Sequence, residues 1–269
     1  VCVCVCVFVC GCVCVCVGEK KREVQADMNF EAATPDVYSR SWFKFSREAW
    51  TPSPGNCDKL QPKLINALEG KKVVAIDANT NHSLALTESG SVYSWGRLER
   101  RQLSNYHMGR IQLQPELIEA LEGKKVVAVS TGEYFSLAVT ESGDVYSWGN
   151  GDYGKLGHND KKNQLQPKLI EVEWEDQVVA VSASFTHSLA LTKSGVVWYW
   201  GPSDFTYRTS DVQLPIKVKV LENERVLSIS AGTSYSLAVT ASGVLGWNNL
   251  TQPPKQILNF EKINEEGKD

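Results

Sequence analysis

One glycine-rich stretch of this chain has the residue types and spacing of a phosphate-binding loop. Residues 149–154 read Gly-Asn-Gly-Asp-Tyr-Gly, which matches the G-x-G-x-x-G pattern, and they follow a strand-like aromatic segment. That pattern binds phosphate when the loop opens a helix whose N-terminus faces the anion. Residues 155–160 read Lys-Leu-Gly-His-Asn-Asp, with no helical apolar period before Pro167. The glycines are therefore interpreted as part of a loop between two strands, and no nucleotide or other cofactor is expected.

Histidine and cysteine side chains are the next candidates for chemistry. His82 and His187 stand where corresponding segments of the chain have Phe135 and Tyr235, which indicates packing and not a base or a ligand. Cys57 lies in a turn-rich stretch with no His or basic cluster that would lower its pKa. No Ser/His/Asp arrangement, paired carboxylates or Cys/His zinc spacing is found. We expect no catalytic residue, no metal site and no enzymatic activity.

Composition limits the class of protein and its partners. The chain has 269 residues, of which 42% are hydrophobic and 22% charged, so disorder throughout is excluded. A net charge of −3, with scattered Lys and Arg, gives no broad basic field for a nucleic-acid backbone. Seven of the eight cysteines lie within the first 16 residues, so no disulfide framework spans the fold. This cysteine usage suits a reducing compartment, and the expected location is cytoplasmic, with a nuclear one as the alternative.

Residues 1–17 alternate Val and Cys almost without interruption. A membrane span would sit at the short limit of about 17 residues, and a signal peptide would need a charged leading segment. The favoured interpretation is a translated GTGTGT repeat, since such alternation is a compositional pattern that no packed core requires. The missing Met further suggests a truncated gene model. We expect residues 1–35 to be a disordered or artefactual run and linker, with membrane contact only if residues 1–17 are a real span.

A fixed internal period organises the rest of the chain. Each repeat contains, in order, a Gln-Pro phrase, a Val-rich run, a Ser-Leu-Ala phrase, a Ser-Gly pair and an aromatic segment that ends in Trp. The glycines of the Ser-Gly pairs are Gly90, Gly143, Gly195 and Gly243. The tryptophans are Trp95, Trp148, Trp200 and Trp247. Their spacings of 53, 52 and 47 residues predict four repeats over 61–258, preceded by a degenerate half repeat at 36–60 and followed by a charged tail at 259–269.

The repeat predicts short strands. The Val-rich run is too short for an ordinary helix and is typical of a strand covered on both faces. The Ser-Gly pair supplies the positive φ of a tight hairpin between the Ser-Leu-Ala and aromatic strands. The Gln-Pro phrase is extended too, so each repeat is a four-stranded blade. The fold class is all-β, a partial β-propeller of about four to five blades. The identical phase of the tryptophans indicates blade core and not an aromatic cage.

The repeats resemble those of the regulator of chromosome condensation, a family that forms seven-bladed β-propellers. The resemblance is carried by Gly132 and by residues 136–140, 142–149 and 151–158, and only this second repeat has the whole pattern. It covers roughly residues 36–258. Seven blades would need about 350 residues, so the resemblance implies an incomplete ring with two blade faces exposed to association.

The loops that follow the tryptophans differ between repeats while the strands do not. They span residues 97–112, 150–164 and 202–213, and loops held on a rigid scaffold are common sites of recognition. In the complete loop the candidate binding residues are Asp152, Tyr153, Lys155, His158 and Asp160. The competing interpretation is a solvated loop without a partner.

Three functions remain open. The first is a non-catalytic scaffold whose loop face binds a protein partner. The second, which the resemblance implies, is guanine nucleotide exchange on a small Ran-like GTPase; no exchange residue carries over, and no basic tail is present. The third is a propeller piece of a large HECT-type ubiquitin ligase, because residues 148–158 and the Leu-Glu-Gly-Lys-Lys phrases are similar to repeats of those proteins. Their transfer chemistry needs a C-terminal domain that these 269 residues do not contain. The expected partner is thus a protein, either a small GTPase or a ubiquitin-pathway component.

Overall fold

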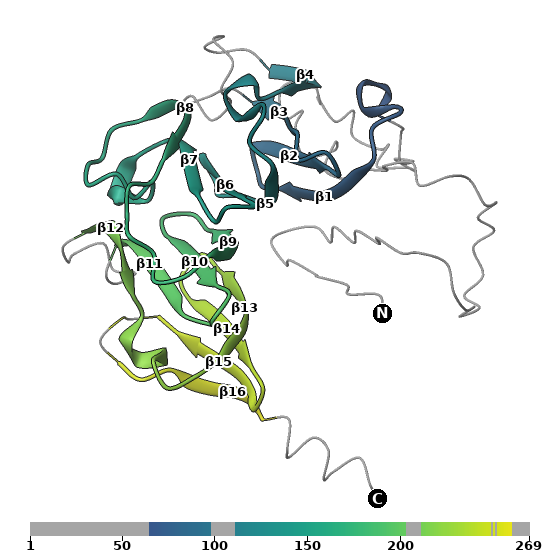
Figure 1. Ribbon diagram of the computed structural model, residues 1–269. Coiled ribbons are helices and arrows are strands. Elements are labelled where there is room, and N and C mark those ends of the chain that lie inside the picture. The colour runs from purple at the N-terminus through teal and green to yellow at the C-terminus, as the bar shows by residue number, and fades with distance from the viewer. Residues whose placement is uncertain (1–64, 98–110, 203–210, 249, 251, 260–269) are drawn as a thin grey trace, which may run out of the picture.

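A computed structural model of the chain describes residues 65–97, 111–202, 211–248, 250 and 252–259. These residues form four antiparallel sheets of four strands each, which confirms the all-β prediction (Figure 1). The strands of blades 1 and 2 are β1 (Val73–Ala78), β2 (His82–Thr87), β3 (Val92–Arg97), β4 (Ile111–Leu117), β5 (Val126–Thr131), β6 (Phe135–Thr140), β7 (Val145–Gly149) and β8 (Gln164–Leu169). Those of blades 3 and 4 are β9 (Val178–Ala183), β10 (Ser188–Thr192), β11 (Val197–Pro202), β12 (Asp211–Lys217), β13 (Val226–Ala231), β14 (Ser236–Thr240), β15 (Gly243–Trp247) and β16 (Lys255–Asn259).

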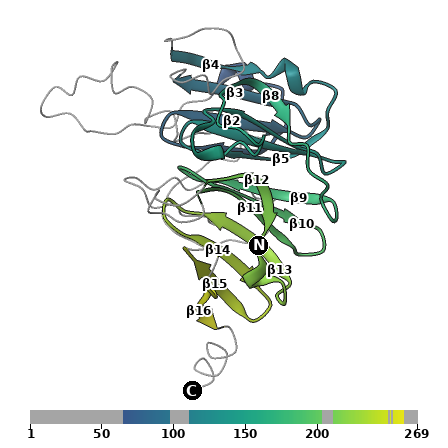
Figure 2. The same ribbon diagram turned by 90° about the vertical axis from the view of Figure 1, so that its left-hand side faces the viewer.

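The four blades follow one another along an open arc (Figure 1). The first strand of each blade lies on the concave side, where β5 contacts β1 and β9, and β9 contacts β13. The fourth strands lie on the convex rim. Seen from the side, the sheets are stacked one above the other (Figure 2). Apart from these sheets, the described residues contain short 3-10 turns: η2 (Asn66–Leu68), η3 (Glu119–Leu121) and η5 (Lys219–Leu221) before blades 1, 2 and 4, and η4 (Asp152–Gly154) after β7.

The Gln-Pro phrase ends a blade and does not begin one. β4, which contains Pro115, pairs with β3, the strand of Trp95, and β8 and β12 pair with β7 and β11 in the same way. Proline is tolerated there because the outermost strand needs no N–H on its free edge. The half repeat at 36–60, the Val-Cys run and the tail beyond 259 lie outside the described residues.

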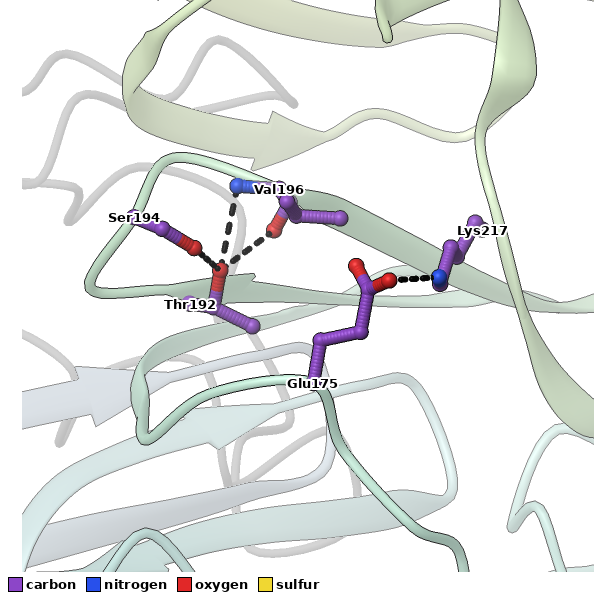
Figure 3. Close-up of polar contacts among 5 residues, drawn as sticks. All are labelled: Glu175, Thr192, Ser194, Val196 and Lys217. Atoms are coloured by element: carbon purple, nitrogen blue, oxygen red, sulfur yellow. Dashed lines mark hydrogen bonds and ion pairs between the residues drawn. The ribbon is translucent and has the colours of Figure 1, made fainter.

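A hydroxyl-rich turn joins the second and third strands of each blade. Thr192 Oγ1 accepts a hydrogen bond from the backbone N–H of Val196 at 3.0 Å and lies 3.0 Å from Ser194 Oγ (Figure 3). The same N–H bond, 3.1 Å long, is present at Thr87 and Thr140. The turn glycines adopt positive φ as predicted: they are Gly90 (86°), Gly143 (92°) and Gly195 (95°).

Gly243 also has a positive φ, but its place in the turn differs from that of the other three glycines. The fourth repeat has one residue fewer between its Ser-Gly pair and Trp247 than the other repeats have. Gly243 therefore lies in the first position of β15, pairs with Asn259 and has a φ of 157°, close to extended backbone. The Ser-Gly pair of this repeat matches the other pairs in residue type, but the segment that follows it is one residue shorter.

The hydrophobic cores lie between blades. Trp148 of blade 2 belongs to one cluster with Leu84 and Leu86 of blade 1, and Trp247 of blade 4 shares a cluster with Leu189 of blade 3. All four repeat tryptophans are buried. Their interpretation as blade core is confirmed, and each sheet depends on its neighbour for the burial of one face.

Candidate interaction site

Antiparallel strand order divides the connections between two faces of the arc. The turn after the first strand and the loop after the third strand of each blade leave from the same end of the sheet. We call this side the loop face; it carries the turns at 79–81, 132–134, 184–186 and 232–234 and the loop at 150–163. The Thr-x-Ser-Gly turns lie at the opposite end, which we call the turn face. The loops at 98–110 and 203–210, which were also candidates for recognition, lie outside the described residues.

The loop at 150–163 bridges blades 2 and 3. Ser188 Oγ of β10 donates a hydrogen bond to the carbonyl of Lys155 at 2.8 Å, and the N–H of Asn159 donates to the carbonyl of Gln213 in β12 at 3.0 Å. Lys161 also forms an ion pair with Asp211. A loop fastened at three points to the next blade is part of the rigid frame, so the sequence motif that encodes it has a structural role.

The glycines of this loop allow its close approach to blade 3. Gly154 has a φ of 72°, and a Cβ there would lie 2.9 Å from the Cα of Gln213. Gly157 has a φ of 79°, and its Cβ would lie 3.1 Å from the indole nitrogen of Trp200. Only the three-residue turn η4 follows β7, and no α-helix. The arrangement of a phosphate-binding loop is therefore not formed, in agreement with the loop interpretation.

Two of the five candidate side chains in this loop pack against residues of blade 2. Lys155 is buried, with its Nζ 5.3 Å from the centre of the Phe135 ring, and its role in binding a partner stays a prediction. His158 is half-buried and hydrogen-bonded to Ser147 Oγ at 2.8 Å. Burial, assisted by the charge of Lys168, lowers the pKa of His158 to about 4. The ring is therefore neutral at pH 7.

The other three candidates lie on or near the surface. Asp160 accepts a hydrogen bond from the backbone N–H of Lys162 at 2.9 Å, which closes the end of the loop. Asp152 is exposed, and its N–H donates to Asn150 Oδ1 at 3.2 Å. Tyr153 is 36% exposed and has left-handed backbone angles, with φ 64° and ψ 9°. Whether these three bind a partner remains a prediction.

Sequence reasoning missed an exposed aromatic residue on the same face. Phe185 lies in the turn between β9 and β10 and is 41% exposed. The equivalent positions of the other turns hold the polar residues Thr80, Glu133 and Thr233. This departure from polarity was the available signal.

The two buried histidines join neighbouring blades. His82 Nε2 is hydrogen-bonded to Ser136 Oγ of blade 2 at 2.7 Å, and His187 Nε2 to Ser236 Oγ of blade 4 at 2.9 Å. His187 Nδ1 also lies 2.8 Å from Ser184 Oγ. Burial lowers the pKa of His82 to about 4 and that of His187 to about 3. The packing interpretation holds for both residues, and the structure adds a hydrogen bond across each junction.

A second junction bond recurs at three places and was not predicted. The backbone N–H of Thr131 donates to Asp77 Oδ2 at 2.7 Å. In the next junctions the N–H of Ala183 donates to Ser130 Oγ at 3.1 Å, and the N–H of Ala231 donates to Ser182 Oγ at 2.9 Å. Each of blades 1 to 3 thus offers one side-chain oxygen to the first strand of the next blade. The recurrence of Ser at this position was visible in the sequence, but its partner was not.

Replacement of Asp77 by Ser, the residue of the other repeats, is expected to change the pH dependence of stability. Burial raises the pKa of the Asp77 carboxyl above its ordinary value, although hydrogen bonds from Thr131 and Ser130 oppose the rise. The folded state therefore holds the proton more tightly than the unfolded state does. The free energy of unfolding falls as pH rises from the carboxyl's unfolded-state pKa to its higher folded-state pKa. The difference in unfolding free energy between Asp77→Ser and the parent, measured by urea titration, should therefore change in favour of the variant as pH rises from 3 to 7. A difference that shrinks over this interval would contradict the assignment.

Neither a metal-binding cluster nor a membrane-spanning helix is found in the described ranges. No three His, Cys, Asp or Glu side chains lie close enough together there to bind a metal ion. No helix in those ranges has the length and apolar character needed to cross a bilayer.

Family models identify the repeats. One model of the regulator of chromosome condensation (RCC1) repeat matches residues 89–139 and 142–191, and a second model of this repeat matches residues 73–99 and 126–155. These are regulator of chromosome condensation repeats. The matches lie within blades 1 to 3, and the two longer ones each run from the turn before the third strand of one blade to the second strand of the next.

Parts of two larger curated proteins are similar to this chain. The chain is 41% identical to human E3 ubiquitin-protein ligase HERC2 over 152 residues, which is 56% of this chain and 3% of the ligase. It is 33% identical to the ultraviolet-B receptor UVR8 of Arabidopsis thaliana over 194 residues, which is 70% of this chain and 43% of the receptor. The chain thus spans less than half the length of either relative.

Two solved structures have the same fold. Prp20p of Saccharomyces cerevisiae superposes with a TM-score of 0.63 at 23% identity, covering 75% of this chain and 54% of Prp20p. Its structure was described together with its binding properties to Gsp1p and histones. Human WBSCR16 superposes with a TM-score of 0.61 at 22% identity, covering 70% of this chain and 54% of the other. These similarities show the propeller fold.

Proposed function

We propose that this RCC1 propeller segment is a non-catalytic protein-interaction module whose loop face binds a protein partner. The observation that carries the proposal is Tyr153, an exposed aromatic residue in left-handed backbone conformation. A side chain other than Gly or Asn adopts this conformation at a cost of roughly 1 kcal/mol or more, and such strain concentrates at functional sites. Tyrosine is also enriched among the residues that contribute most to protein interfaces.

The frame around Tyr153 supports this role. The loop is fastened to blade 3 through Asn159 and Lys161, and Gly151 N–H donates to Asn163 Oδ1 at 2.9 Å within the loop. A loop already held in one conformation has little entropy to lose when it binds. Phe185 supplies a second exposed aromatic side chain on the same face, from blade 3.

Removal of both aromatic side chains is expected to weaken partner capture. The variant Tyr153→Ala/Phe185→Ser should capture a smaller amount of partner than the parent chain, by a factor of about ten or more. This is the effect typical of the loss of two interface anchors. Leu113→Ser is the matched control, because Leu113 is 59% exposed but lies in β4 on the rim. The measurement is quantitative mass spectrometry of proteins captured from cell extract, with melting temperatures checked for all variants. Equal losses for the control and the double variant would refute the loop-face assignment.

The sequence identity to HERC2 favours a more specific candidate, namely recruitment of partners to ubiquitin transfer. The 41% identity over 152 residues is the observation in its support. If it holds, the partners lost from Tyr153→Ala/Phe185→Ser include ubiquitin-pathway proteins or ubiquitin conjugates. If the lost partners include neither ubiquitin-pathway proteins nor ubiquitin conjugates, this candidate is excluded and the proposal of a general interaction module still stands.

Guanine nucleotide exchange is the remaining candidate, and it can be measured directly. A shared fold with Prp20p at 23% identity carries no residue of an exchange surface to this chain. Acceleration of labelled GDP release from a Ran-like GTPase, with loss of the effect in the double variant, would support exchange. An unchanged release rate at high chain concentration would exclude it.

A further inference from the structure

The outermost strand of each blade has an edge that no other strand of its own sheet covers, and prolines interrupt this edge in three blades. Pro115 lies inside β4, Pro167 inside β8 and Pro215 inside β12. A proline has no N–H, so it interrupts the ladder of hydrogen bonds that an added strand would need. Natural sheets use edge prolines in this way to prevent edge-to-edge association. The rims of blades 1 to 3 therefore carry this protection in their sequence.

β16, the outermost strand of blade 4, lacks such a proline (Figure 1). Its residues read Lys-Gln-Ile-Leu-Asn, and Pro253 and Pro254 precede the strand. In blade 3 a loop also holds the outermost strand, because the N–H of Asn159 donates to the carbonyl of Gln213. No described loop makes such a backbone bond to residues 255–258. Among the described rim strands, only β16 thus has an interior without proline.

The edge of β16 is apolar and carries a single charged residue, Lys255. Ile257 is 57% exposed and Leu258 is 48% exposed. The carbonyl oxygen of Leu258 is directed at β15, since a Cβ on Gly243 would lie 2.0 Å from it. Ile257 is an extra residue of this strand that is paired with no residue of β15. An edge of this kind can accept a further strand through main-chain hydrogen bonds.

The sequence of β16 is complementary to itself in antiparallel register. Pairing that places Ile257 opposite Ile257 of a second copy aligns all five residues of the two strands. Lys255 then lies opposite Asn259, so the two positive charges do not meet. This matters because like charges directly opposite each other destabilise a strand pair. The contact is also identical for both copies, as the two-fold symmetry of most homodimers requires.

We propose that β16 is a dimerisation edge, at which a second copy of this chain adds its own β16 in antiparallel orientation. The two blades 4 then form one continuous sheet, with the Ile257 side chains of the two copies side by side at the two-fold axis. The contact lies at the rim of the arc, so it uses neither the faces on which blades stack nor the loop face. The inference is therefore independent of the proposed function.

Sedimentation velocity of the full chain, with a thiol reductant present, tests this proposal. We expect a change from monomer to dimer as the chain concentration rises. Ile257→Lys and Ile257→Glu should each stay monomeric, because like charges would meet at the axis, and an equimolar mixture of the two variants should form the dimer again. Leu113→Lys and Leu113→Glu are the matched controls, since Leu113 is 59% exposed in β4, beside Pro115. Both controls should dimerise as the parent does.

Hydrogen exchange of the parent chain gives a second readout that needs no variant. Exchange of the amides in residues 255–259 should be slower by about tenfold or more in concentrated than in dilute solution, with no change in β4. A chain that stays monomeric at every concentration would overturn the proposal. A dimer that persists in Ile257→Lys, or a mixture of folded variants that stays monomeric, would overturn it too. Slower exchange confined to β14 would place the contact on a blade face and would likewise exclude the β16 edge.

Discussion

Acidification from pH 7 to pH 4 is expected to lower the unfolding free energy of this chain by on the order of 3 kcal/mol for each of His82 and His187. Both rings have folded-state pKa values below the ordinary value of 6.5, at about 4 and about 3. The unfolded chain therefore takes up protons first, so the stabilisation is fully present above pH 6.5 and is lost as pH falls toward 4. His158, which is less buried, adds a smaller loss of the same sign.

The physical cause is the position of the two rings between blades. A protonated imidazole would place a charge in a desolvated junction. It would also alter the hydrogen bond to Ser136 or Ser236, since a charged ring can only donate. Urea titrations at several pH values, followed by tryptophan fluorescence, measure the effect. The control is Asn79→Gly/His82→Phe, which copies the Gly132–Phe135 pair into blade 1 and should remove about half of the pH dependence. A stability that does not change between pH 7 and pH 4 would contradict burial of the rings.

His187→Phe is expected to destabilise the chain by about 2 to 3 kcal/mol, as overpacking of a filled junction does. A phenyl ring needs the space that Gly132 leaves beside Phe135, but blade 3 has Ser184 at that position. The variant also removes the imidazole nitrogens bonded to Ser184 and Ser236. Both effects act on the junction between blades 3 and 4.

The double variant Ser184→Gly/His187→Phe should recover most of this loss, because it reproduces the pair that blade 2 uses. Gly132→Ser provides the converse experiment, and it should destabilise the junction between blades 2 and 3 by a similar amount. Urea titration at pH 7 measures all three proteins. A double variant no more stable than His187→Phe would show that the paired positions do not specify the junction.

The sequence predicted the strands and the core because both follow from local pattern. The Val-rich and Ser-Leu-Ala phrases have apolar residues at strand spacing, and the tryptophans recur in phase, so β-structure and blade core were accessible. One detail depended on three-dimensional pairing and could not be predicted: the Gln-Pro phrase pairs with β3, the preceding strand of the same blade.

The candidate site could be predicted only in part, since residue type does not reveal what the next blade covers. Lys155 and His158 have the polarity of contact residues, yet the loop that carries them folds onto blade 3. The bonds from Thr131 to Asp77 and from Ala183 to Ser130 link residues more than fifty positions apart. Such contacts depend on how one sheet stacks on another. Phe185, by contrast, could have been found by comparing equivalent turn positions.

Hydrogen exchange of the chain, free and bound to a partner that it captures, tests the central claim most directly. Binding at the loop face predicts slower exchange in residues 150–157 and 184–187, around Tyr153 and Phe185, with no change in the Thr-x-Ser-Gly turns at 87–91 and 140–144. Those turns lie on the turn face, opposite the loop face, and serve as the internal reference. Protection confined to these turns, with unchanged exchange around Tyr153, would contradict the account.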